Sequence, residues 1–351
     1  MSDEVRAALS SVVDGGTLST DEARLAMGSV MDGEATASQL AALLVALRMR
    51  GETIEELAGF ATAMRDRVLK VDAPAGTIDT CGTGGDGSGT FNISTAAALV
   101  VAAAGVPVAK HGNRAITSQS GSADVLEALG VRTDHDAESA GAALREHGFA
   151  FLFAPRFHPA MRHAGPTRKE IGVRTAFNLL GPLTNPAGAR RQVVGVGDPP
   201  AAPKIAEVLR MLGTESSFVV HGDGVDELPL DGSGVLYHAS PEGVVRHEID
   251  ASKLGLSTAA TRALSGGDPA ANARLIEAVF GGESGARRDV VLLNAGAALL
   301  AAGRVEQLEG GLELAALTID SGLVRELLSA LRDEKRVADE ARARETESAP
   351  A

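Results

Sequence analysis

Two segments in the first half of the chain hold the residue types that bind phosphate groups. The first is a glycine loop, Cys81-Gly82-Thr83-Gly84-Gly85-Asp86-Gly87, and the second is the polar run of residues 110–122. Glycine lets backbone N–H groups approach a ligand closely because no Cβ stands in the way. Lysine and arginine add positive charge, and the planar arginine fork matches an oxyanion. Together the two segments predict a pocket for phosphate oxygens, with side-chain donors from Lys110, His111, Asn113, Arg114, Thr117, Ser118, Ser120 and Ser122.

The glycine loop follows an expected strand and precedes Asn92-Ile93-Ser94-Thr95, which opens an alanine-rich helix. Free N–H groups and the dipole at a helix start attract an anion. The loop is neither a Walker loop, since no Gly-Lys-Ser/Thr follows, nor a GxGxxG dinucleotide motif. A glycine turn by itself is also compatible with a tight strand-to-helix connection, so its significance comes from the second segment.

An acidic turn, His221-Gly222-Asp223-Gly224-Val225-Asp226-Glu227, follows a later strand that ends at Val220. In a protein that binds phosphate, adjacent carboxylates at the end of a strand favour Mg²⁺, which takes carboxylate, water and phosphate oxygens. The alternative is a solvated acidic turn that Asp223 shapes.

A basic segment lies between residues 156 and 190, with a helical centre expected from Thr167 to Asn178. Its cations fit a second anion such as a carboxylate, or else a charged helix face with Gly-Pro turns. The sequence shows no His/Cys set at zinc spacing and no Gly-x-Ser-x-Gly elbow.

The overall composition narrows the possible partners. The chain has 351 residues, a net charge of −13 and only 3% aromatic residues. A negative protein repels the phosphate backbone of nucleic acid, and few aromatics remain for base stacking. A single cysteine, Cys81, fits a reducing cytoplasm. The first residues lack the pattern of a signal peptide, and the apolar stretch from Ala96 to Val108 is too short to span a bilayer.

Residues 1–70 are expected to be wholly helical, because three capping boxes punctuate them at Ser19/Glu22, Thr36/Gln39 and Thr53/Glu56. From residue 72 onward, short apolar strands alternate with alanine-rich helices, which favours a parallel sheet covered on both faces. The expected strands are 77–79, 107–109, 149–153, 192–196, 217–220, 235–238 and 246–249. The expected helices are 94–104, 123–129, 201–212, 258–265, 269–280, one starting near 290, and one containing 319–330.

These elements predict an α/β protein with a small all-helical domain and a larger α/β domain that has a mostly parallel central sheet. The small domain comprises residues 1–71, joined by about 168–188, and the large domain comprises 72–167 and 189–332. Residues 333–351 are charged without an apolar stripe, so we expect a frayed tail. We also expect the segment 156–190 to return to the helical bundle and close a cleft.

Four separated motifs occur in the order found in one family: GTGGDG, KHGNRA…SGSADVLEALG, HPAMRHAGP.R.E.G.RT.FNLLGPLTNP and VHGDGVDE. Over residues 5–331 the chain closely resembles the anthranilate phosphoribosyltransferases of tryptophan biosynthesis. The resemblance implies a two-domain fold with the substrates between the domains and a homodimer formed through the small domains. It also implies a Mg²⁺-dependent reaction of anthranilate with 5-phosphoribosyl 1-diphosphate, giving N-(5-phosphoribosyl)anthranilate and diphosphate.

Site residues follow from the matching motif positions. The resemblance assigns the phosphoribosyl diphosphate to Gly82, Gly85, Asp86, Thr90, Asn92, Ser94, Thr95, Lys110, Ser118 and Ser122. It assigns the metal to Ser94, Asp226 and Glu227. It assigns anthranilate to Gly82, Asn113 and Arg168, with His111, His158 and Pro182 lining its path. No covalent nucleophile is implied.

Four positions depart from the pattern expected of the family. Thr117 replaces a common serine and keeps its hydroxyl, whereas Gln119 replaces a common lysine, which should weaken the affinity for the diphosphate. Phe157 lies where histidine or tyrosine is frequent, and Thr167 where valine is frequent. Both substitutions bear on how anthranilate, the aromatic acid, would be recognised.

Two alternatives remain to be tested against the structure. A pyrimidine-type nucleoside phosphorylase shares the architecture but should not depend on Mg²⁺, so Asp226 and Glu227 argue against it. A non-catalytic relative that binds nucleic acid would need a basic stripe, which a net charge of −13 disfavours.

Overall fold

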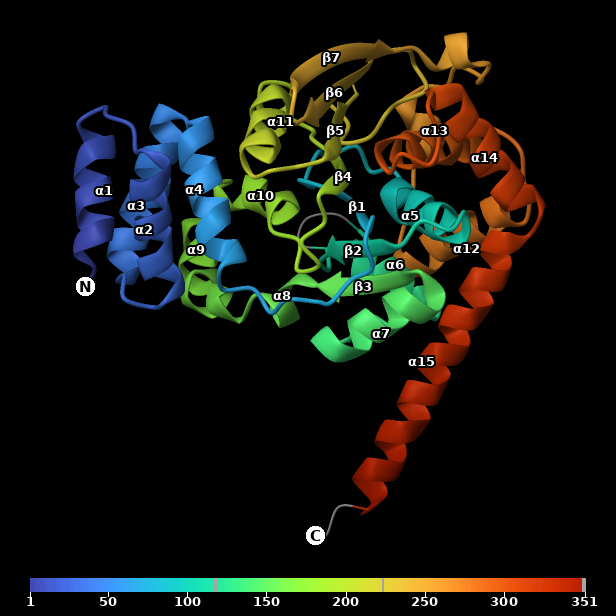
Figure 1. Cartoon of the computed structure of the whole chain (residues 1–351), viewed down its shortest axis with the longest axis horizontal. Helices are drawn as coiled ribbons and strands as arrows, with labels where there is room; N and C mark the ends of the chain where they lie inside the picture. The colour runs from blue at the N-terminus through green and yellow to red at the C-terminus, as the bar shows by residue number, and fades with distance from the viewer. Residues whose placement is uncertain (116–118, 223, 349–351) are drawn as a thin grey trace.

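The computed structural model describes residues 1–115, 119–222 and 224–348. Thr117, Ser118 and Asp223 therefore lie outside the described residues. The chain forms a helical bundle beside a larger α/β body, as Figure 1 shows. The bundle consists of α1 (Asp3–Val13), α2 (Thr20–Met31), α3 (Ala37–Arg50) and α4 (Ile54–Arg65).

The three capping boxes expected from the sequence begin α2, α3 and α4. In each box the Ser or Thr side chain accepts from a backbone N–H, while the Glu or Gln side chain accepts from the N-cap N–H. Glu56 is the buried member of this set. Its carboxylate accepts from the N–H groups of Leu18 and Thr53 and pairs with Arg50, and the residue has no exposed surface. One side chain thus joins the start of α4 to the ends of α3 and the α1–α2 loop.

The large domain is built on a seven-stranded sheet of order β3-β2-β1-β4-β5-β6-β7. The first five strands in this order are parallel, and β6 and β7 add an antiparallel hairpin at one edge. The expected mostly parallel sheet is confirmed. The strands are β1 (Ile78–Gly82), β2 (Val108–Gly112), β3 (Phe149–Phe153), β4 (Arg191–Gly195), β5 (Ser216–His221), β6 (Gly234–Ser240) and β7 (Gly243–Ile249).

Both faces of the sheet are covered. On β4, Val193 packs into one apolar core of the large domain, while the next residue, Val194, packs into a second core that includes residues of the bundle. Alternate residues of a strand point to opposite faces, so consecutive apolar residues indicate burial on both sides. The remaining helices of this domain are α5 (Ile93–Ala103), α6 (Ser122–Ala128), α7 (Ala137–His147), α11 (Ala201–Met211), α12 (Pro269–Phe280), α13 (Ala286–Ala301), α14 (Leu308–Asp320) and α15 (Leu323–Ser348), with short 3₁₀ turns η3 (Ala251–Leu254) and η4 (Thr261–Leu264).

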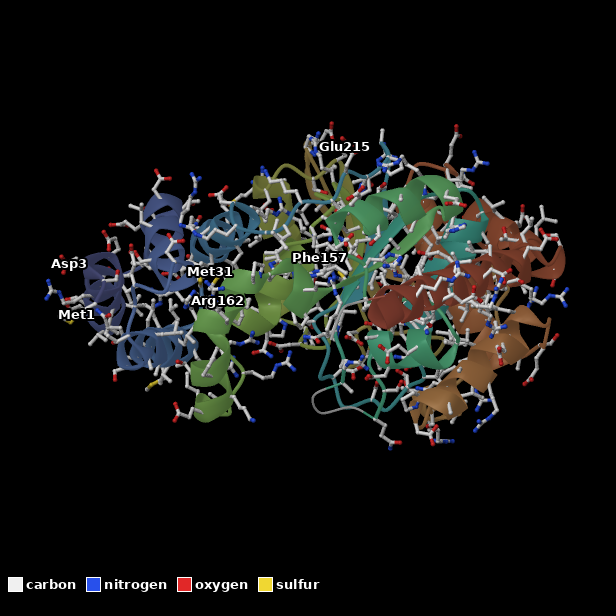
Figure 2. All side chains as sticks on the ribbon, turned by 90° about the horizontal axis from the view of Figure 1, so that it is seen from below. Met1, Asp3, Met31, Phe157, Arg162 and Glu215 are labelled. Atoms are coloured by element: carbon white, nitrogen blue, oxygen red, sulfur yellow. The ribbon has the colours of Figure 1, made fainter. Side chains whose placement is uncertain are left out.

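The segment between β3 and β4 packs against the bundle, as the sequence predicts. Its turn η1 contacts α2, α9 contacts α3, and α10 contacts α4. Met31 of α2 and Arg162 of η1 lie close together in Figure 2. Closure of a cleft by this segment stays a prediction. The segment comprises α8 (Ala154–Phe157), η1 (Pro159–His163), α9 (Gly165–Ile171), α10 (Phe177–Leu180) and η2 (Gly181–Leu183).

Three expected helices were wrong in detail. Residues 258–265 form only the 3₁₀ turn η4. The helix expected over 167–178 is divided, because α9 ends at Gly172, whose φ of +69° lies in the left-handed region. The helix expected over 319–330 is divided at Gly322, with a φ of +85°. Glycine is the residue that adopts this conformation without strain, and a helix ends there.

The expected frayed tail was wrong as well. The charged residues from Asp333 continue α15 to Ser348, and this helix projects from the body in Figure 1. Pairs Lys335–Asp339 and Arg336–Glu340 lie four residues apart on its surface. Such i,i+4 pairs support a helix that lacks an apolar stripe. No helix in the described part of the chain combines the length and apolarity needed to cross a bilayer.

The buried capping box gives a first prediction. Glu56→Ala should lower the free energy of unfolding by about 3–5 kcal/mol, because it leaves Arg50 and the Leu18 N–H without their partner. The matched control is Glu22→Ala, which removes the same capping position at an exposed site and should cost about 1 kcal/mol or less. Urea unfolding followed by far-UV circular dichroism measures both. Equal losses in the two variants would contradict the role assigned to Glu56.

Candidate active site

The glycine loop, the polar run and the acidic turn meet at one edge of the sheet. They follow β1, β2 and β5, which are parallel to one another, and the carboxyl ends of parallel strands lie together. The acidic turn must cross the end of β4 to reach the glycine loop. Gly195 makes this possible, because a Cβ there would lie 1.7 Å from the carbonyl oxygen of Asp226.

Asp226 and Glu227 bind backbone groups of the glycine loop and of α5. The Gly84 N–H donates to Asp226 Oδ2 at 3.1 Å, and the Ser94 N–H donates to Glu227 Oε1 at 3.0 Å. Asp86 completes the cluster, since its Oδ2 accepts from the Asp226 N–H at 3.3 Å. A carboxylate therefore occupies the first turn of α5, where the helix dipole favours negative charge.

This cluster brings acidic side chains close together where little water reaches Asp226 and Glu227. Burial, followed by the charge of Asp86, raises the pKa of Asp226 to about 7. Burial, followed by the charge of Asp226, raises the pKa of Glu227 well above its usual range. Carboxyl groups in this state are stabilised by a cation. Within the described part of the chain, no group of three His, Cys, Asp or Glu side chains surrounds a single point. The oxygen donors present fit Mg²⁺, which commonly takes one or two carboxylates and completes its shell with phosphate and water.

Lys110 lies beneath the loop with 2% of its surface exposed. Its Nζ donates to the Thr80 carbonyl at 2.5 Å and lies 3.4 Å from Ser94 Oγ. Burial lowers the pKa of Lys110, against the charges of Asp79, Glu227 and Asp226. The Lys110 Nζ thus lies next to the acidic cluster, whose negative charge favours its charged form against the effect of burial.

His111 and His158 form a buried pair at the end of β2. Their Nε2 atoms are 3.2 Å apart, and His111 Nδ1 lies 3.2 Å from the Gly181 carbonyl. Burial lowers the pKa of His111 to about 3 and that of His158 to about 4. Both rings are therefore neutral at pH 7. His111 donates from Nδ1, because Gly181 offers only an acceptor, and so accepts at Nε2 from His158.

The start of α5 holds a network of small polar side chains. Asn92 Oδ1 accepts from Ser120 Oγ at 3.1 Å and from Asn272 Nδ2 at 2.9 Å. Thr95 is 1% exposed, and its hydroxyl has no partner among the described residues. Thr90 Oγ1 lies 3.3 Å from Ser88 Oγ. A buried hydroxyl without a partner is costly in a folded protein, so Thr95 is a candidate for a hydrogen bond to a ligand.

Arg168 lies on α9, on the side of the bundle. Its guanidinium is 4.8 Å from the centre of the Phe177 ring, and burial lowers its pKa. The described ion pairs give it no carboxylate partner. An arginine that is largely desolvated and stacked on an aromatic ring presents its fork for a planar anion.

Comparisons with known proteins agree with this arrangement. Residues 75–325 match the model for the glycosyl transferase family α/β domain, and residues 6–68 match the helical bundle domain of the same family. The anthranilate phosphoribosyltransferase of Azospirillum brasilense is 51% identical over 329 residues, which cover 93% of this chain and 92% of that protein. The chain belongs to the anthranilate phosphoribosyltransferase family.

Solved structures of the family support the same fold. The crystal structure of the enzyme from Thermus thermophilus has a TM-score of 0.88 and 45% identity, covering 94% of this chain and 99% of that one. The Saccharomyces cerevisiae enzyme in complex with PRPP (5-phosphoribosyl 1-diphosphate) and Mg has a TM-score of 0.87 and 26% identity, covering 96% and 99%. The helical domain beside a mostly parallel sheet is thus the architecture of anthranilate phosphoribosyltransferases.

The structure brings most of the residues predicted from the family motifs to this edge of the sheet. Gly82 lies against Asp226, since a Cβ there would be 2.6 Å from Asp226 Oδ2. Ser122 Oγ donates to the Asn113 carbonyl at 3.2 Å. Pro182 is buried next to Gly181, the partner of His111. Ser118 and Thr117 lie outside the described residues, so their positions remain predictions.

One expected phosphate donor was wrong. Arg114 is held by Asp124 and Glu127, with Nη1–Oδ1 and Nη1–Oε2 distances of 3.0 and 2.9 Å. Two carboxylates compensate its charge, so this guanidinium supports α6 instead of a ligand. Phe157, one of the departures from the family pattern, is 1% exposed and fills an apolar cluster with Val71 and Leu152. Its ring therefore stabilises the fold next to His158.

Sequence reasoning missed the residue that joins three of these segments. Asp79 is fully buried in β1. Its carboxylate accepts from the His111 N–H at 3.1 Å and from Asn185 Nδ2 at 2.8 Å. Burial raises its pKa. The available signal was an acidic residue inside an apolar strand, because such a residue is rarely buried without a partner.

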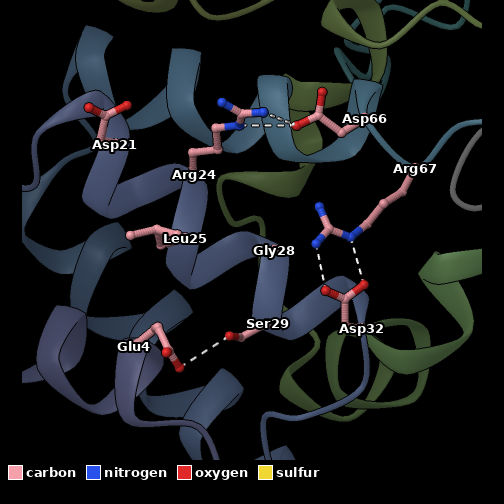
Figure 3. A pocket seen from close by; sticks show the side chains of 9 residues that line it. All are labelled: Glu4, Asp21, Arg24, Leu25, Gly28, Ser29, Asp32, Asp66 and Arg67. Carbon is pink, nitrogen blue, oxygen red and sulfur yellow. Dashed lines mark hydrogen bonds and ion pairs between the residues drawn. The ribbon is translucent and has the colours of Figure 1, made fainter.

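A surface pocket on the helical bundle is separate from this site. Its lining includes Arg24, which pairs with Asp66, and Arg67, which pairs with Asp32, as Figure 3 shows. Both cations are neutralised and further acids line the pocket, so it does not fit a phosphate. This pocket is therefore not the predicted phosphate site.

The raised pKa of Asp226 gives a second prediction, for the metal-free protein. A carboxyl whose pKa is higher in the folded state loses stability as the pH rises from its unfolded value near 4 through about 7. Asp226→Asn removes this titration. Its stability advantage over the wild type should therefore grow by about 1–2 kcal/mol between pH 5 and pH 8, allowing for partial solvation.

The measurement is urea unfolding in EDTA at both pH values. Asp14→Asn, which changes an exposed carboxyl on the bundle, is the control and should show no such difference. An advantage of Asp226→Asn that is the same at pH 5 and pH 8 would contradict the charge crowding assigned to this cluster.

Proposed function

We propose that this chain transfers the phosphoribosyl group of 5-phosphoribosyl 1-diphosphate to the amine of anthranilate, releasing diphosphate. Membership of the anthranilate phosphoribosyltransferase family supports the reaction. The convergence of Asp226 and Glu227 on the glycine loop and the start of α5 is the observation that carries its assignment to this edge of the sheet. The relatives named above are anthranilate phosphoribosyltransferases. Neither a nucleoside phosphorylase nor a non-catalytic nucleic-acid-binding protein is therefore favoured.

The donor sugar binds between the glycine loop, the start of α5 and the run after β2. Backbone N–H groups and the Thr95 hydroxyl donate hydrogen bonds to phosphate oxygens, and Lys110 supplies positive charge. The full set is Gly82, Gly85, Asp86, Thr90, Asn92, Ser94, Thr95, Lys110, Ser118 and Ser122. Asn92 acts mainly by fixing the loop of Ser120, because its amide oxygen already accepts two hydrogen bonds.

Mg²⁺ is the cofactor, held by Ser94, Asp226 and Glu227. The carboxylates lie side by side with raised pKa values, and the Ser94 hydroxyl lies 3.4 Å from Lys110 Nζ on the same side of α5. When bound, the ion neutralises charge on the leaving diphosphate. The structure of the yeast relative in complex with PRPP and Mg supports the assignment.

Anthranilate binds on the bundle side, with its carboxylate at Arg168 and its amine near Asn113 and Gly82. His111, His158 and Pro182 line the path. The aryl amine is already neutral at pH 7, so a strong general base is unnecessary, and the two neutral histidines add no charge that would repel the cationic ribose carbon. Orientation dominates instead, and is worth on the order of 7–11 kcal/mol in well-aligned reactions.

The competing reaction is hydrolysis, so the two domains must exclude water as they approach each other. A homodimer that associates through the helical domain is supported by large apolar side chains exposed on the bundle, including Val13, Leu25 and Met49. A free cysteine and an acidic net charge fit a cytoplasmic enzyme without a nucleic-acid partner.

The test is a fluorescence assay of anthranilate consumption with PRPP and Mg²⁺. We expect consumption that stops on addition of EDTA. The variant Asp226→Asn/Glu227→Gln should lose at least about a hundredfold in turnover, because the ion loses both carboxylates. The matched control is Glu309→Gln/Glu313→Gln, which removes two exposed charges on α14. No consumption in the wild type would refute the reaction, and turnover in EDTA would refute the metal.

Arg168→Ala provides a separate prediction for the acceptor. The apparent KM for anthranilate should rise about tenfold to a hundredfold, with a smaller change in kcat, because a charged hydrogen bond to the carboxylate is lost. Steady-state kinetics with each substrate varied in turn measure both constants. If only the KM for PRPP rose, the two substrates would have been assigned to the wrong sides.

A further inference from the structure

Arg174 reaches from the bundle side of the molecule to the glycine loop. It lies between α9 and α10, and its Nη1 donates to the carbonyl oxygens of Gly84 at 3.0 Å and Gly85 at 3.1 Å. A Cβ on Gly85 would lie 2.4 Å from this nitrogen, so a larger residue could not hold the contact. None of the described ion pairs gives Arg174 a carboxylate partner. Its charge is thus directed at two backbone carbonyls.

This contact determines where the loop's N–H groups point. In a trans peptide the C=O and the N–H of the same unit point in opposite directions, and the described peptide bonds include no cis bond. The Gly84 carbonyl shares its peptide with the Gly85 N–H, and the Gly85 carbonyl shares its peptide with the Asp86 N–H. Both N–H groups therefore point away from Arg174. Neither has a partner among the described residues, and successive free N–H groups form an anion-binding concavity.

The loop needs such an anchor. Gly84, Gly85, Gly87 and Gly89 have φ values of +63°, +67°, +74° and +67°, and glycine loses more conformational freedom on ordering than any other residue. Its first part is tied by the Thr83 N–H to the Gly195 carbonyl at 2.9 Å. Its last part is tied by Gly89, whose carbonyl accepts from the Gly266 N–H at 2.9 Å. Arg174 holds the peptides between these two ties.

Arg174 also belongs to the segment that carries the acceptor site. Gly172 ends α9, and its N–H donates to the Arg168 carbonyl at 3.3 Å. Arg168 and Arg174 are thus six residues apart on either side of one left-handed glycine. A shift of this segment would move the acceptor-binding and loop-binding guanidinium groups together.

We propose that Arg174 is a positioning residue that fixes the carbonyls of Gly84 and Gly85 and thereby aims the N–H groups of Gly85 and Asp86 at the diphosphate of the donor. The identity of that anion rests on the proposed function, whereas the anchoring of the loop does not. Hydrogen bonding to the carbonyls also polarises the two peptide groups and strengthens their N–H donors. Arg174 therefore acts on the donor substrate without touching it.

The first test needs no substrate. Hydrogen exchange in the free protein should be faster at the bonded amides of Thr83 and Gly84 in Arg174→Ala than in the wild type, and intermediate in Arg174→Lys. The exposed arginine variant Arg210→Ala, on α11, should match the wild type. Unchanged exchange in Arg174→Ala would overturn the proposal. So would faster exchange spread over the sheet and helices, since that indicates general destabilisation.

The second test uses inorganic diphosphate with Mg²⁺ as the probe in isothermal titration calorimetry. The dissociation constant should rise about tenfold in Arg174→Ala, because binding must then order a loop that has lost its anchor, and less in Arg174→Lys. In steady-state kinetics the KM for PRPP should rise by a similar factor, while that for anthranilate stays within about twofold. An equal rise in both KM values, or none, would overturn the positioning role. A wild-type protein that binds no diphosphate would refute the proposed function, and the exchange result would still decide the anchoring.

Discussion

Crowded carboxyl groups at one edge of the sheet set the constraint on which the rest of this structure depends. Asp86, Asp226 and Glu227 lie close enough to raise pKa values within the group, and Lys110 is the cation that acts on Glu227 from within the protein. Burial and crowding therefore favour the protonated forms of Asp226 and Glu227 as long as no cation is present. A cation that binds beside them would favour the carboxylate forms, so the pair is suited to a metal site.

Backbone proximity is what makes the crowding possible. The acidic turn belongs to β5, but its partners belong to β1 and α5, so the turn must pass over β4. Gly195 and Gly82 leave the space that this passage needs, and Gly85 leaves space for Arg174 on the other side of the loop. At Gly82 and Gly85 the missing side chain lets a charged group approach the backbone, and at Gly195 it lets the backbone carbonyl of Asp226 approach. These glycines are therefore required for close approach as well as for loop flexibility.

The sequence predicted those features that depend on local rules. Three capping boxes located helices of the bundle, and the alternation of short apolar strands with alanine-rich helices indicated a sheet buried on both faces. Prediction from the sequence failed where a residue's role depends on which side chains pair with it in the folded protein. Arg114 has the chemistry of a phosphate ligand, but Asp124 and Glu127 fold back onto it. From the sequence, Asp79 was identified only as a residue of an expected strand. Its role in joining segments comes from β2 and Asn185, which pack around its carboxyl group. The charged tail lacked an apolar stripe, yet pairs along its surface support a helix.

The two sides of the site differ in their electrostatics in a way that suits the proposed reaction. In the proposed reaction, the donor would bind on the side of Asp226, Glu227 and Lys110, where charge separates as diphosphate leaves. On the acceptor side, burial keeps His111 and His158 neutral, and Arg168 is stacked on an aromatic ring. A protonated histidine near the ribose carbon would oppose the positive charge that develops on it, whereas the neutral pair, whose Nε2 atoms bond each other, avoids this cost. In the proposed reaction, burial of the histidine pair would therefore serve the chemistry, and Asp79 would contribute by fixing the strand that carries His111.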